Sequence, residues 1–136
     1  MPNHLRCQPP LVLLLLIAGC GKVAPTYPPS DGDFVRNIDE QGTAQVWGIQ
    51  FSADKPVGNK ASSSFTGQLH SDPEKTDARI SVELGDDIHI KLEKIPGSPI
   101  TLEMNGQSYG SLEVGDRVAI DEQREVQVND MLRQPN

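Results

Sequence analysis

The strongest constraint on the fold of this chain is an alternation of apolar and polar side chains in residues 80–92. The apolar side chains stand at every second position within each half of the stretch: Ile80, Val82 and Leu84, then Ile88, Ile90 and Leu92. A period of two is typical of a β-strand with one buried face. A three-residue loop, Gly85 to Asp87, puts both apolar rows on one face, whereas a two-residue turn puts them on opposite faces. The pattern therefore predicts a hairpin with Leu84 opposite Ile88; a five-residue loop keeps the same register.

Other stretches alternate in the same way, and none shows an apolar stripe with the 3.6-residue period of a helix. Residues 46–51 predict a strand with Trp47, Ile49 and Phe51 on one face, and a second strand follows at 65–69. Asn105-Gly106 is a strong signal for a two-residue hairpin turn. From Tyr109 to Leu112 the apolar side chains no longer fall at every second position, which predicts a bulge at Gly110. Asn129-Asp130 predicts a tight turn after a last strand, 126–128.

A phrase of the first hairpin recurs thirty residues later. Residues 83–90, Glu-Leu-Gly-Asp-Asp-Ile-His-Ile, align with 113–120, Glu-Val-Gly-Asp-Arg-Val-Ala-Ile. The same register argument predicts a second hairpin, with Val114 opposite Val118. Together these patterns predict an all-β domain over residues 43–136, a single antiparallel, meander-like β-sandwich or small barrel of about seven or eight strands.

The chain begins with a positive leader followed by an apolar run. Arg6 precedes a run that starts at Leu11-Val-Leu-Leu-Leu-Leu-Ile17 and, counted to Cys20, is about half as long as the roughly 20 residues of a transmembrane helix. The next residues, Ala18-Gly19-Cys20, complete a stretch that resembles the lipobox of a bacterial lipoprotein signal peptide. The resemblance implies removal of residues 1–19 and lipidation of Cys20, with palmitate among its acyl chains. The alternative is an ordinary secretory signal cut near Ala18 or Gly19.

Cysteine and charge limit what the processed chain can do. Cys7 would leave with the signal peptide and Cys20 would be acylated, so residues 21–136 hold no thiol for a disulfide, a metal site or a nucleophile. Without Arg6, 11 Lys and Arg face 19 Asp and Glu, a formal net charge of −8. This charge disfavours nucleic acid as a partner, and contact with a membrane is expected from the lipid rather than from a basic patch.

Residues 20–42 have the composition of a flexible tether, with prolines, glycines and few apolar side chains. Gly21 after the lipidated cysteine is not the Asp associated with retention in an inner membrane. The lipoprotein resemblance therefore implies a location in the cell envelope, outside the cytoplasm, and in the outer membrane where there is one.

The C-terminal quarter carries a second resemblance. Residues 105–121 and the phrase Val126-Gln-Val-Asn129 look like a pattern in uncharacterised envelope proteins of planctomycete-type bacteria. The resemblance implies a β-module of the envelope and brings no known activity.

Few residues suggest chemistry. His70 and His89 lack the spacing of a zinc site and are expected at the surface. Ser52-Ala-Asp-Lys55 matches the Ser-x-x-Lys motif of penicillin-recognising enzymes, but that motif needs one helical turn and Pro56 follows at once. Five acidic residues are expected at strand ends, where carboxylates could converge on calcium or serve as turn residues: Asp86, Asp87, Asp116, Asp121 and Asp130.

These observations favour a non-catalytic, lipid-anchored envelope module that is structural or binds another envelope component. No cofactor is expected. One alternative is a module that binds calcium or a glycan through its acidic loops, and a hydrolase is the weakest. An exposed edge strand or apolar groove would favour partner binding.

Overall fold

The computed structural model describes residues 24–136, so the expected signal peptide, Cys20 and its first neighbours lie outside the described residues. The described part contains eleven strands and one short 3-10 helix, η1 (Pro73–Lys75). The strands are β1 (Phe34–Ile38), β2 (Gln41–Val46), β3 (Ile49–Asp54), β4 (Ala61–Gln68), β5 (Asp77–Leu84), β6 (Ile88–Lys94), β7 (Ile100–Met104), β8 (Gln107–Leu112), β9 (Arg117–Ile120), β10 (Val126–Val128) and β11 (Met131–Arg133).

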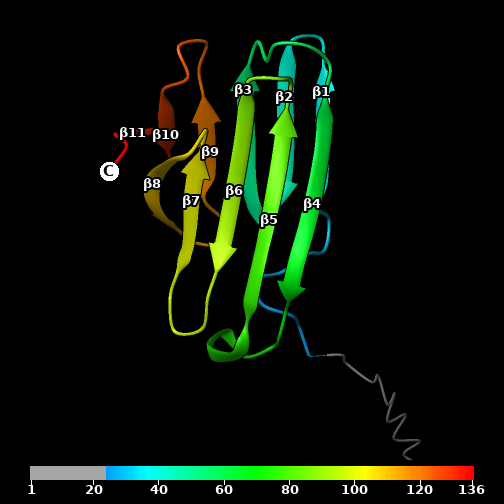
Figure 1. Ribbon diagram of the computed structural model, residues 1–136, viewed down its shortest axis with the longest axis vertical. Helices are drawn as coiled ribbons and strands as arrows, with labels where there is room; N and C mark the ends of the chain where they lie inside the picture. Colours follow the sequence, from blue (N-terminus) through cyan, green and yellow to red (C-terminus); the bar gives the residue numbers. More distant parts are fainter. Residues whose placement is uncertain (1–23) are drawn as a thin grey trace, which may run out of the picture.

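The strands form two sheets that pack face to face as a sandwich (Figure 1). One sheet has the order β1-β2-β3-β9-β10-β11 and the other the order β4-β5-β6-β7-β8. Every pairing is antiparallel except that of β3 with β9, which is parallel. The all-β sandwich is confirmed. Both sheets stay open within residues 24–136, so the barrel alternative is wrong for this part of the chain.

The core forms because apolar side chains alternate along strands of both sheets. Ile80, Val82 and Leu84 of β5 lie opposite Leu92, Ile90 and Ile88 of β6, and all six are buried. The predicted three-residue loop and its register are therefore confirmed. The facing sheet contributes a second set of buried side chains, Ala44, Val46, Ile49, Phe51, Ala53, Val118, Ile120, Val126 and Val128.

The β7–β8 hairpin also follows the sequence. Met104 pairs with Gln107 across Asn105-Gly106, and the register shifts between Thr101 and Glu103, opposite Gly110. Gly110 has φ +90°, a conformation that glycine adopts readily, so the predicted bulge is confirmed. The Asn129-Asp130 turn joins β10 to β11 as predicted.

Two predicted strand arrangements are wrong. The strand expected over 46–51 is instead a hairpin, in which Val46 pairs with Ile49 and Trp47-Gly48 form the turn with positive φ. The second copy of the Glu-apolar-Gly-Asp phrase is not a hairpin: β8 pairs with β7, whereas β9 lies in the other sheet beside β3 and β10. Val114 is 45% exposed in the crossover between the sheets.

The folded domain begins earlier than Thr43, the predicted boundary. Residues assigned to the tether form β1 and the start of β2. Further upstream, the Tyr27 N–H donates to the His70 carbonyl at 2.6 Å, and the Thr76 hydroxyl donates to the Tyr27 carbonyl at 2.7 Å. The chain is therefore part of the fold from Tyr27 onward.

The sandwich has two ends, which we call the Tyr27 end and the Arg124 end after a residue at each. The Tyr27 end carries η1 and the loop 95–99, and the opposite Arg124 end carries the loops 55–60, 85–87 and 121–125 (Figure 1). Among residues 24–136, no helix has the length and apolar character that crossing a bilayer requires.

Candidate binding surfaces

Strand β4 is an edge strand with solvent on its free side. It pairs with β5 alone (Figure 1). All eight of its residues are exposed. The Gly85 N–H donates to the Lys60 carbonyl at 2.7 Å, so residues 60 and 85 form a hydrogen-bonded pair of the ladder. In an antiparallel ladder such pairs alternate with non-bonded ones. The backbone groups of Ala61, Ser63 and Phe65 therefore point away from β5, and we call these groups the β4 edge.

The β4 edge lacks the features that usually protect an edge strand, which are charges, proline, a bulge or extreme shortness. Residues 61–68 read Ala-Ser-Ser-Ser-Phe-Thr-Gly-Gln, without a charge or a proline. Gly67, near the end of the strand, has φ +107°. The edge of regular β geometry thus extends over residues 61–66.

The other outer strands are better protected. At β8, the Arg133 guanidinium donates to the carbonyls of Tyr109 and Ser111, and the Asn136 N–H donates to the carbonyl of Ser108. Strand β11 has three residues, and β1 carries Arg36 at its centre. Among the described strands, β4 therefore offers the longest uncharged free edge.

Phe65 adds an apolar element to this edge. It lies opposite Ile80 in the ladder, so its side chain has the parity of the core face. Ile80 is 6% exposed, whereas Phe65, on the edge strand, is 46% exposed. A partner strand placed on the β4 edge would therefore cover apolar surface as well as pair with the backbone.

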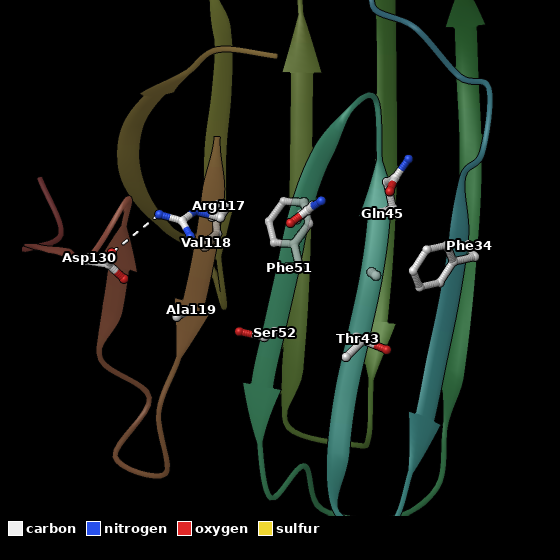
Figure 2. Close-up of a pocket in the computed structure, with 11 residues that line it drawn as sticks. Phe34, Thr43, Gln45, Phe51, Ser52, Arg117, Val118, Ala119 and Asp130 are labelled. Atoms are coloured by element: carbon white, nitrogen blue, oxygen red, sulfur yellow. Dashed lines mark hydrogen bonds and ion pairs between the residues drawn. The ribbon is translucent and has the colours of Figure 1, made fainter. Parts of the chain in front are cut away.

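A second surface is a shallow depression of about 390 Å³ on the outer face of the six-stranded sheet (Figure 2). Cross-strand partners share a face, and here Thr43 lies opposite Ser52 and Gln45 opposite Gln50. Phe34 borders the depression on β1, and the Arg117–Asp130 ion pair, 3.4 Å between nitrogen and oxygen, borders it on the other side. The centre of this outer depression is neutral and rich in hydroxyl and amide groups.

A charged cluster joins the two sheets at the Arg124 end. The Arg124 Nη2 lies 2.6 Å from Asp87 Oδ2, and the same guanidinium donates to the carbonyls of Asp54, Lys55 and Asp121. Asp87 Oδ1 accepts from the Val57 N–H at 2.9 Å. Because every partner is a protein group, this cluster ties the loops together and leaves no free charge for a ligand.

The Arg124 cluster also sets the pKa of Asp87. Partial burial acts to raise the pKa of this carboxyl, but the hydrogen bonds from Val57 and Arg124 outweigh it. The pKa of Asp87 therefore lies below its ordinary value, and the carboxylate stays charged at neutral pH.

The five predicted acidic residues do not come together. Asp86 and Asp87 lie at the Arg124 end with Asp121, whereas Asp116 and Asp130 lie at the start of β9 and in the β10–β11 turn. Asp116 accepts from Glu113 and Asn129, and Asp121 accepts from the Glu125 N–H. In the described part of the chain no three His, Cys, Asp or Glu side chains gather in a way that could hold a metal ion. These carboxylates serve turns and ion pairs.

The positions of the remaining candidate residues do not form the zinc site or the Ser-x-x-Lys pair considered above. His89 and His70 are exposed, as predicted. Ser52 lies in β3 and Lys55 in the following turn with φ +47°, so the pair does not share a helical turn. Trp47 is 1% exposed and belongs to the core.

Neither binding surface is predicted by the sequence patterns, and the Arg124 cluster is not predicted by them either. The uncharged run at 61–68 was a usable signal for an open edge. The outer depression and Arg124 gave no local signal, since their members come together only through long-range strand pairing.

No protein-family model matches this chain, and neither the curated proteins nor the solved structures yielded a match.

Proposed function

We propose that this protein is a lipid-anchored, non-catalytic module of the bacterial cell envelope that binds a partner through the β4 edge. The observation that carries the proposal is the exposure of all eight β4 residues on a strand without charges. An edge of this kind is a template for another strand, because its free N–H and C=O groups match those of an extended chain.

The anchor half of the proposal rests on the lipobox-like sequence ending at Cys20. Hydrogen bonds tie Tyr27 to the domain, and this residue lies seven positions after Cys20 in the sequence. At roughly 3.3–3.6 Å per residue, this segment reaches at most about 25 Å. The Tyr27 end of the sandwich would therefore face the membrane at short range, and the outer membrane is favoured in a cell that has two.

Partner binding through the β4 edge can be tested by a proline substitution in β4. Ser63→Pro removes an N–H that points away from β5, so it blocks the edge without breaking the β4–β5 ladder. Ser63→Thr keeps the N–H and is the matched control. In a pull-down from detergent-solubilised envelope, we expect the wild type and Ser63→Thr to retain a protein that Ser63→Pro loses. Identical recovery with Ser63→Pro, in a protein whose unfolding curve is unchanged, would contradict edge binding.

The outer depression supports a second candidate function, the binding of a neutral glycan. Its hydroxyl and amide side chains can both donate and accept, as sugar hydroxyls do, and Phe34, with the Arg36 guanidinium 4.8 Å from its ring centre, lies at its border. Gln45→Ala and Gln50→Ala together should lower retention on immobilised envelope polysaccharide. Glu103→Ala, on the other sheet, is the control. Equal retention of both variants would exclude the depression.

A further inference from the structure

The β4 edge has properties that bear on the identity of its partner. An edge that meets only foreign strands can carry charges that repel its own copies, and many edge strands do carry such charges. Residues 61–68 carry none. On the neighbouring strand β5, the acidic side chain of Glu83 contacts Lys60 and His89, and Asp77 lies opposite Gln68 at the far end of the ladder. The negative charge of the chain is therefore not concentrated beside residues 61–66, where two copies would meet.

The side chains of β4 are also complementary to themselves. In an antiparallel pair, the outward-pointing residues Ala61, Ser63 and Phe65 must face outward-pointing residues of the other strand. Several registers match outward-pointing residues within β4, and the longest in which Phe65 does not face itself pairs residues 61–67 with 67–61 of the other copy. This register puts Phe65 opposite Ser63 of the other copy and Ser64 opposite itself. The bulky Phe65 then meets a small side chain in both halves, so the same residues satisfy both copies of a two-fold interface.

We infer that the partner at the β4 edge is a second copy of this chain, joined through an antiparallel β4–β4 pair that makes one continuous ten-stranded sheet. This inference rests on the proposed edge-binding function. Specific interfaces bury about 1,200–2,000 Å² in total, and one pair of eight-residue strands lies at the low end of that range or below it. The dimer is therefore weak in dilute solution and is favoured where anchoring confines the copies to one membrane.

Cysteine cross-linking in isolated membranes tests the register directly, using the full chain. Ser64 at the two-fold axis lies in a non-bonded pair, where Cα atoms are about 4.5 Å apart, within reach of a disulfide. Thr66 is on the same face of the same strand, but its two copies are offset by four residues, or about 13 Å along the strand. We expect mild oxidation to convert Ser64→Cys into a covalent dimer, several-fold more than Thr66→Cys or the parent chain.

Four outcomes separate the inference from the function on which it rests. A Ser64→Cys dimer that disappears when Ser63→Pro is added supports the second copy. Equal cross-linking of Ser64→Cys and Thr66→Cys, which indicates random collision, overturns it. If no dimer forms but Ser63→Pro still loses a different protein in the pull-down, the β4–β4 dimer is wrong and edge binding stands. If Ser63→Pro changes neither the cross-linking nor the pull-down, both the dimer and edge binding are wrong.

Discussion

At the scale of single residues, Arg124 holds the two sheets together at one end. Its guanidinium comes from the β9–β10 turn, and Asp87 comes from the β5–β6 turn of the other sheet. The side chains of the pair are 21% and 33% exposed, so the pair is partly shielded from solvent. Arg124 itself has φ +64°, a conformation that few side chains adopt, which the five hydrogen bonds of the guanidinium help to hold.

Removing one member of this pair should destabilise the domain. We expect Asp87→Asn to lower the free energy of unfolding by about 1–3 kcal/mol, because it leaves the Arg124 charge without its counter-ion. Lys55→Ala, which removes the exposed ion pair with Glu122, is the control and should have little effect. Urea unfolding followed by fluorescence of Trp47, the only tryptophan, measures both. A smaller loss for Asp87→Asn than for Lys55→Ala would show that the cluster does not stabilise the fold.

The same carboxylate predicts a pH dependence. Because the pKa of Asp87 is lower in the folded state than in the unfolded chain, the folded state binds fewer protons and the contribution of Asp87 is complete above the unfolded pKa of about 3.9. It is lost as the pH falls through the lower folded pKa. The difference in unfolding free energy between wild type and Asp87→Asn should therefore be constant from pH 7 to about 5 and shrink below pH 4. A difference that grows on acidification would reverse the assigned sign.

At the scale of elements, local patterns predicted hairpins well where the turn itself carried the information. The Gly85–Asp87 loop and the Asn105-Gly106 turn fixed their registers, because a slip of one residue would expose every core side chain. The phrase at 113–120 has nearly the same letters but joins two sheets. Its Gly115 N–H bonds to the Gly48 carbonyl of the β2–β3 turn, a contact 67 residues away that no local pattern encodes.

Gly67 shows how closely β4 and β5 approach at the end of their ladder. A Cβ at this position would overlap the carbonyl oxygen of Asp77, and φ is +107°. Gly67→Ala should therefore lower the free energy of unfolding by more than about 1 kcal/mol. Gly106 has φ +80°, and a Cβ added there would have no atom within 4 Å. The substitution Gly106→Ala therefore introduces backbone strain without steric overlap. In the same urea assay Gly106→Ala should cost less than Gly67→Ala; the opposite order would mean that the β4–β5 end relaxes freely.

At the scale of the whole molecule, the sequence predicted the class of fold but not its topology. Alternation identified strands, and the absence of an apolar stripe with a 3.6-residue period left a sandwich or a barrel. The choice between them depends on the parallel β3–β9 pair and the crossover at 113–116, which are long-range contacts. Composition also misplaced the start of the domain, since the proline-rich segment around Tyr27 is held by specific hydrogen bonds rather than by burial of an apolar stripe.

The proposed anchor concerns the whole molecule, because it decides which end of the sandwich meets a membrane. We expect Cys20→Ala to abolish labelling by radioactive palmitate in growing cells. Cys7→Ala should keep the label, since Cys7 lies in the segment that the lipoprotein resemblance implies is removed. Two or more buried acyl chains, at about 0.8 kcal/mol for each CH₂, make such an anchor stable, whereas one chain gives only marginal binding.

Labelling that survives in Cys20→Ala would exclude this anchor, and with it the confinement that favours a weak β4–β4 dimer. The stability of the domain should be unaffected, because the first backbone hydrogen bond to the domain within residues 24–136 is at Tyr27, seven residues after Cys20. The urea unfolding curve of Cys20→Ala should therefore match that of the wild type. Cross-linking of Ser64→Cys should be weaker when Cys20→Ala is also present. The reason is that loss of the anchor removes the confinement to one membrane but leaves the folded domain unchanged.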